Sequence, residues 1–155
     1  MTTTTVEQLI AMAGAGIHDE RIAAAASAIK PGHLIEITTA DEVQEHSTAA
    51  ANAAKLIALT NLANSSDIDT AYTVGESVRF ACYGSGQEVV LRLAAAATAV
   101  TIGAALESDG NGTVRILTTD AATDDTQRDS VVAYALEAVD NSGGASEVLI
   151  KARIA

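Results

Sequence analysis

Residues whose side chains could move protons or hold metals are scattered along this 155-residue chain. The densest group is His18-Asp19-Glu20, in which a histidine that titrates near neutral pH stands beside two carboxylates. Neighbouring residues of an extended chain point to opposite faces, so these three side chains do not converge on one substrate. We interpret the group as a hydrated junction rather than a proton shuttle.

The histidine spacing does not predict a metal site. His18, His33 and His46 are separated from one another by more than a dozen residues, whereas zinc ligands recur at much shorter spacings. We interpret each histidine as a solvated or turn residue. The sequence therefore predicts no bound metal.

Close pairs of carboxylates can serve acid–base chemistry or calcium binding. Here they lack the spacing of a calcium loop, and solvated loops explain them better; the pairs are Asp41 with Glu42, Asp67 with Asp69, and Asp124 with Asp125. The Gly84-Ser85-Gly86 segment is too short to cradle a phosphate and belongs to no longer glycine-rich motif. We predict neither an enzyme nor a bound cofactor.

The single cysteine, Cys82, lies in an apolar strand-like run, and we interpret it as a small buried side chain. One cysteine cannot form an intrachain disulfide, which is typical of a reducing compartment. The N-terminus lacks the basic region of a signal peptide, and the longest nearly uncharged apolar stretch, residues 93–106, is too short to span a membrane. We expect a soluble protein made in the cytoplasm.

The net charge of −11 argues against nucleic acid or an anionic membrane as the main partner, because phosphate binding depends on clustered Lys and Arg. Hydrophobic residues make up 48% of the chain but aromatic residues only 3%, so the core must consist of Val, Ile, Leu and Ala. Such small side chains bury little surface each. We expect the chain to bind other protein subunits and to gain stability from them.

The elements that position these residues are predicted to be strands. Pro31-Gly32 marks a turn after an alanine-rich run, and residues 33–37 alternate as a half-buried strand does. Residues 48–62 are compatible with a strand or a helix, because alanine favours helices. Residues 61–73 form a polar loop.

Strand signals are clearer in the second half of the chain. The Gly84-Ser85-Gly86 turn predicts a hairpin between residues 77–83 and 88–93, and Asp109-Gly110-Asn111-Gly112 predicts another. Residues 130–139 and 147–154 follow as apolar strands. Turns about every dozen residues indicate a mainly β fold, a small barrel or sandwich.

The first twenty residues are predicted to be an extended N-terminal arm, and residues 21–155 a single β-rich domain. Gly14 and Gly16 interrupt any helix in this segment. We propose that the arm contacts a partner by strand addition. Its candidate binding residues are Thr2, Thr3, Thr4, Thr5, Val6, Leu9 and Ile10.

Residues 21–154 resemble a family of tailed-bacteriophage head decoration proteins. The similarity rests on the order of seven blocks, which are IKPGHLIE at 29–36, AAKLIAL at 53–59, IDTAY at 68–72, VGESV at 74–78, GSGQEV at 84–89, IGAALESDG at 102–110 and AYALEA at 133–138. Glu76 stands where the family pattern leads us to expect Asp. The resemblance favours a strand at 56–59 and implies a small, β-tulip-like barrel or sandwich.

The same resemblance implies a capsid cement protein. Such a protein binds the outer surface of the assembled head, bridges subunits of the major capsid protein, and commonly forms a homotrimer. It would be made in the host cytoplasm and end on the outside of the virion. The alternatives are a tail-tube or other virion subunit and a surface glycan-binding module, although the few aromatic residues disfavour sugar binding.

Overall fold

The predicted mainly β class is confirmed. The structure is a computed structural model that describes residues 11–13, 16–25, 27–61, 67–118 and 129–155, and within them only Asp129 and Ser130 have helical geometry. Eleven strands lie in these residues: β1 (Ala11–Ala13), β2 (Ile17–Ile22), β3 (Ile35–Ile37), β4 (Val43–Glu45), β5 (Leu56–Ala58), β6 (Ser77–Cys82), β7 (Glu88–Leu93), β8 (Ala105–Ser108), β9 (Val114–Ile116), β10 (Val131–Ala135) and β11 (Val148–Ile154).

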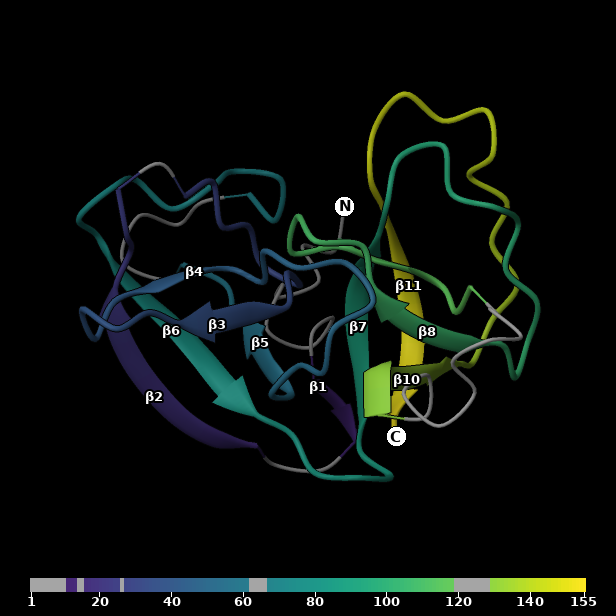
Figure 1. The fold of residues 1–155 in the computed structure, drawn as a ribbon, viewed down its shortest axis with the longest axis horizontal. Coiled ribbons are helices and arrows are strands. Elements are labelled where there is room, and N and C mark those ends of the chain that lie inside the picture. The colour runs from purple at the N-terminus through teal and green to yellow at the C-terminus, as the bar shows by residue number, and fades with distance from the viewer. Residues whose placement is uncertain (1–10, 14–15, 26, 62–66, 119–128) are drawn as a thin grey trace, which may run out of the picture.

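Five strands close into a small barrel, on the right in Figure 1. Their order is β7-β11-β10-β8-β9, and a parallel pairing of Leu93 with Val114 joins β9 back to β7. The other end of β7 pairs with β1 instead, through Val89 and Glu88. Strand β11 therefore covers one edge of β7 along its whole length, whereas β1 and β9 share the other edge, one at each end.

The barrel interior is filled by small and branched side chains, as the composition predicted. On β11 the inward residues Ile150, Ala152 and Ile154 are buried, while Lys151 and Arg153 between them are exposed. This alternation is the two-residue period of a strand with one face in the core. Removing so much apolar surface from water is the main stabilising contribution to the barrel.

A second lobe consists of the antiparallel sheet β2-β6-β5 and the hairpin β3-β4, on the left in Figure 1. Strand β6 separates two cores, because Ala81 belongs to the barrel cluster whereas Val78 and Phe80 belong to a smaller cluster on the opposite face. The smaller cluster also contains Tyr72, whose hydroxyl donates to the Leu59 carbonyl at 2.9 Å.

The predicted hairpin between residues 77–83 and 88–93 is wrong. Strands β6 and β7 belong to different sheets, although the glycine turn between them does form, with Gln87 N donating to Gly84 O at 3.2 Å. Strand β6 already pairs with β2 on one edge and β5 on the other, so no edge is left for β7. The turn instead moves the chain from one lobe to the other.

Several local predictions are confirmed. Asp109-Gly110-Asn111-Gly112 joins β8 to β9 as a hairpin, and Gly32 takes a φ of 88° in the turn after Pro31. Residues 48–61 contain strand β5 and no helix. The alanine run after Arg21 contributes only a bridge from Ala23 to Val43.

Cys82 is exposed, which contradicts its interpretation as a buried residue. It shares a face of β6 with the buried Val78 and Phe80, but its cross-strand neighbour on β2, Ile17, is itself 78% exposed. An apolar neighbourhood in sequence therefore did not guarantee burial at the last position of the strand.

Strand β2 crosses residue 20, where the sequence placed the boundary between arm and domain, and pairs with β6 over its whole length. Residues 1–10 lie outside the described residues. The arm and the domain boundary stay predictions.

Candidate functional site

The seven predicted binding residues of the arm, Thr2 to Thr5, Val6, Leu9 and Ile10, all lie outside the described residues. We therefore built the candidate site from the polar groups that the structure does bring together. These groups gather where the two lobes meet.

Arg92 is the largest side chain that the fold buries completely, at 1% exposure on strand β7. Its Nε donates to the Pro31 carbonyl at 2.7 Å, and its Nη2 donates to the Ile68 carbonyl. Its Nη1 donates to Asp69 Oδ1 at 3.0 Å and to Glu147 Oε1 at 3.2 Å. One barrel residue thus holds two loops of the other lobe.

Glu147 is the shared acceptor of this cluster. It accepts from Lys30 Nζ at 2.7 Å and lies 2.9 Å from His33 Nε2. Burial alone would raise the pKa of this carboxyl, but the hydrogen bonds from His33 and Lys30, together with the nearby Arg92 charge, lower the pKa to about 2. Glu147 is therefore ionised at any physiological pH.

The sequence predicts His33 to be a solvated or turn residue. Its N–H donates to the Lys30 carbonyl at 3.0 Å and so closes the turn at Pro31-Gly32, but at 3% exposure the side chain is buried and not solvated. The backbone N–H of Lys30 donates to its Nδ1 at 3.1 Å. The neutral ring must then carry its proton on Nε2, where it donates to Glu147. We call Lys30, His33, Asp69, Arg92 and Glu147 the lobe clasp.

An open hollow of about 510 Å³ lies beside the clasp, and its lining includes Lys30, His33, Glu45 and Glu147. The charged groups of this lining have partners. Glu45 accepts from the Ala28 N–H at 3.0 Å, and Asp109 accepts from Arg115 at 3.2 Å. The arrangement suits a rigid junction better than a reacting centre.

A second cluster has the residue types of a serine hydrolase triad. Ser108 Oγ lies 2.7 Å from His46 Nδ1, and His46 Nε2 lies 3.8 Å from Glu36. Ser108 is completely buried, so its hydroxyl cannot reach a substrate as the triad requires. His46, also predicted to be a solvated or turn residue, is buried at 4% exposure beside the β8–β9 hairpin, where Gly112 N donates to its carbonyl at 3.2 Å.

The hairpin tip at residues 109–112 packs against the second lobe. Gly112 has a φ of 71°, and a side chain there would meet Glu45 and His33 atoms at about 3.0 Å. Leu34 N donates to Gly112 O at 2.7 Å. The turn at residues 109–112, which the sequence predicted as a local hairpin, therefore also forms a contact between the two lobes.

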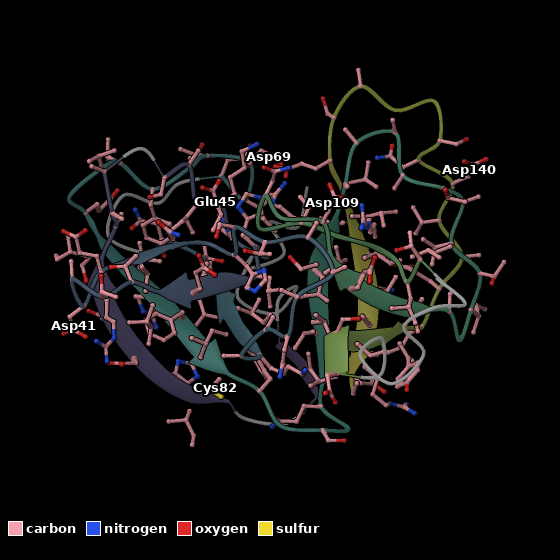
Figure 2. All side chains as sticks on the ribbon, in the orientation of Figure 1. Asp41, Glu45, Asp69, Cys82, Asp109 and Asp140 are labelled. Carbon is pink, nitrogen blue, oxygen red and sulfur yellow. The ribbon has the colours of Figure 1, made fainter. Side chains whose placement is uncertain are left out.

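Figure 2 shows Asp41 at the far end of one lobe and Asp140 at the far side of the other, whereas Glu45, Asp69 and Asp109 lie toward the middle of the view. Among the described residues, no group of three or more His, Cys, Asp or Glu is arranged to hold a metal ion. Over the same residues, no helix is long and apolar enough to cross a membrane.

Sequence reasoning missed the lobe clasp. One signal was available, because Arg92 is a charged residue inside the apolar run EVVLRL, and a buried charge requires a partner. Its partner Glu147 lies 55 residues away in the chain, and nothing in the sequence indicates that pairing.

The chain matches no family model, and no curated protein matches it in sequence. Its fold is similar to the crystal structure of the head fiber gp8.5 N base of bacteriophage phi29. That comparison gives a TM-score of 0.55 and 14% sequence identity, covering 90% of this chain and 95% of the other. At this identity the two proteins share a fold, and the likeness shows nothing further.

Proposed function

We propose that this chain is a structural protein of a phage head rather than an enzyme. The observation that carries the proposal is the fold shared with a phage head fiber base over nine-tenths of the chain. The block order that resembles head decoration proteins points the same way independently.

Within that class, the role we propose is capsid decoration. The protein binds the outer surface of the assembled head and bridges subunits of the major capsid protein, as a homotrimer. Several modest contacts made by one rigid body raise the effective affinity far above that of each alone. The predicted arm, Thr2 to Thr5 with Val6, Leu9 and Ile10, adds a strand to a neighbouring coat subunit.

The internal chemistry of the described residues supports a binding role. The buried polar side chains at the lobe junction hydrogen-bond to one another, and Ser108 is completely buried. Several large apolar side chains remain exposed on the surface, including Ile17, Val74, Ile102 and Tyr134. Such side chains are available for contact with other proteins.

A second candidate is the base of a head fiber, which the description of the similar structure favours. Both roles require binding to the outside of the head. A fiber base would carry a projecting structure above the capsid, whereas a cement protein would lie against it and span seams between coat subunits.

The test is to mix the purified chain with mature heads that lack it and to image them by cryo-electron microscopy, beside a light-scattering mass of the free protein. Ordered density on the outer lattice supports the head-surface role, and its shape separates cement from fiber base. Bare heads would overturn it, and assembly of the free protein into tubes would favour a tail-tube subunit.

A further inference from the structure

The tip of the β8–β9 hairpin joins two residues in opposite environments. Asn111 is exposed, and none of the described residues hydrogen-bonds its side chain, whereas Gly112 directly after it is buried. In an asparagine–glycine pair the backbone nitrogen of the glycine readily attacks the side-chain amide, because glycine has no Cβ to hinder the approach. The electrophile of this reaction is free here, and its nucleophile is enclosed.

Gly112 is held to the second lobe by both of its backbone groups. Its N–H donates to the His46 carbonyl at 3.2 Å, and its carbonyl accepts from Leu34 N at 2.7 Å. His46 N in turn donates to Leu34 O at 3.0 Å. The Gly112 nitrogen must therefore give up a bond to the second lobe before it can react with Asn111.

The lobe clasp lies beside these two bonds. A Cβ at Gly112 would meet the His33 ring at 3.0 Å, and His33 Nε2 lies 2.9 Å from Glu147 of the clasp. The hollow beside the clasp is lined by Asn111 as well as by clasp residues. The clasp and the Gly112 bonds are thus parts of one contact between the lobes, and loosening the clasp loosens the bonds.

An open junction permits a reaction that needs only water. Gly112 N attacks Asn111 Cγ, a five-membered succinimide ring closes, and the Cγ–Nδ2 bond breaks. The proton of Gly112 N leaves with the side-chain amide as ammonia. Water then opens the ring at either carbonyl. One product has an aspartyl residue at position 111, and the other has an isoaspartyl residue, in which the main chain runs through the former side chain.

The isoaspartyl product does not fit the closed junction. It adds one carbon to the main chain directly before Gly112, where even a methyl group would press on Glu45 and His33 atoms. Both products also place a new carboxylate in a hollow that already contains those of Glu45, Asp109 and Glu147. Like charges at such short range repel one another.

The pair Asn141-Ser142 provides an internal control. Asn141 is buried, and its amide nitrogen donates to the carbonyls of Ala94 at 2.8 Å and Ser146 at 3.0 Å. Ser142 also carries the Cβ that glycine lacks. The fold thus holds this amide away from the next backbone nitrogen, so we expect Asn141 to stay intact while Asn111 reacts.

We propose that Asn111-Gly112 is a modification site, at which the chain deamidates through its own backbone when the lobe junction opens, and that the isoaspartyl product keeps the junction open. The closed junction protects the site, and each opening exposes it. The inference does not depend on the proposed function. It adds to a rigid binding protein a slow and irreversible conversion to a looser form.

The first test follows the full chain during incubation at mildly alkaline pH, beside the same chain unfolded in guanidinium chloride. Peptide mapping by mass spectrometry detects deamidation as a gain of one mass unit. We expect Asn111 to react at least about tenfold more slowly in the folded chain, because two backbone bonds must open first. Equal rates would overturn the protection by the junction, and no reaction in either sample would overturn the site.

A pair of matched variants tests whether the clasp controls the reaction. Glu147→Gln removes the charge of the buried clasp acceptor, and Glu88→Gln removes that of the Arg153 partner at the barrel surface. We expect deamidation to be at least about tenfold faster in Glu147→Gln, since a buried pair loses one partner, and unchanged in Glu88→Gln. Exchange of the Gly112 amide should accelerate in proportion. Equal deamidation in the two variants, or faster exchange without faster deamidation, would contradict control by the junction.

The effect of the modification is tested on the separated products. In the isoaspartyl product the amides of Leu34 and Gly112 should exchange at least about tenfold faster than in the parent chain, since their bonds across the junction cannot both re-form. The aspartyl product keeps the normal main chain and is the control. Equal exchange in the isoaspartyl product and the parent would show that the junction accommodates the added carbon and would overturn this part of the inference.

Discussion

The two lobes stabilise themselves in different ways. The larger cluster contains twenty buried residues and extends from the barrel into the second lobe through residues such as Leu34, Ile57 and Ala81, with Tyr83 as its one aromatic member. The second cluster contains nine, among them Phe80 and Tyr72, and its sheet ends at the open β2 edge. A closed barrel of small residues needs no partner to protect its edges, whereas the smaller lobe depends on two aromatic side chains and on its contacts with the barrel.

The largest expected effect tests that dependence. Phe80→Ala removes the phenyl ring from the centre of the smaller cluster and should lower the free energy of unfolding by about 4 kcal/mol. The measurement is urea unfolding followed by hydrogen exchange of the two lobes. Ile150→Ala in the barrel is the matched control. If Phe80→Ala loosens both lobes equally, the lobes are one cooperative unit.

The lobe clasp provides the next effect. Arg92→Met removes one partner of a buried pair and leaves Glu147 without that charge, which should cost about 3 kcal/mol. Chemical denaturation measures it. The double variant with Glu147→Gln should lose less than the sum of the two single variants, because both act on one interaction. Strict additivity would show that the pair is not coupled.

Glu147 also predicts a pH dependence. Its pKa falls from an ordinary 4.5 to about 2 on folding, so its contribution is complete above pH 4.5 and is lost as pH falls toward 2. The loss should be on the order of 3 kcal/mol. Unfolding measured from pH 6 to pH 2 should show a shallower decline for Glu147→Gln than for the parent chain. Parallel curves would assign the acid sensitivity elsewhere.

Gly112→Ala tests the hairpin contact between the lobes. The positive φ and the close approach of Glu45 and His33 should together cost about 1.5 kcal/mol. Gly86→Ala has a similar φ but open space around it, and so isolates the backbone contribution. Thermal unfolding of the two variants gives the comparison. Equal losses would mean that the lobe contact tolerates a methyl group.

The smallest effect is expected at Cys82→Ser. The side chain is exposed, so the free energy of unfolding should change by less than about 0.5 kcal/mol. Ala81→Ser, at the buried neighbouring position, is the contrasting variant and should be clearly destabilising. A large loss of unfolding free energy in Cys82→Ser would indicate that the Cys82 side chain is buried.

Much of the strand content was predictable because its signals are local. Asp109-Gly110-Asn111-Gly112 indicates a tight hairpin whatever surrounds it, and the alternation of residues 148–154 indicates a strand with one buried face. The partners of a strand are not local. The Gly84-Ser85-Gly86 turn looks the same whether it joins paired strands or separate sheets, and only the occupied edges of β6 decide.

The polar junction was less predictable for a related reason. His33, His46 and Arg92 are buried because segments distant in sequence cover them and supply hydrogen bonds. The sequence around a single histidine does not indicate which distant residue will accept its hydrogen bond. A charged residue inside an apolar strand does indicate a buried partner, and Arg92 was the position where that reasoning applied.

The route of the chain between the lobes has a consequence for how such a fold diversifies. The chain leaves the six-stranded sheet after β1 and returns to it at β7, and Gly16 on the outward path lies so close to Ala81 and Cys82 on β6 that a side chain there would collide with them. Entry and exit are therefore adjacent, and the second lobe is an insertion between strands β1 and β7 of the six-stranded sheet. An insert whose two ends are adjacent can be lengthened or replaced while the strand order of the six-stranded sheet stays the same.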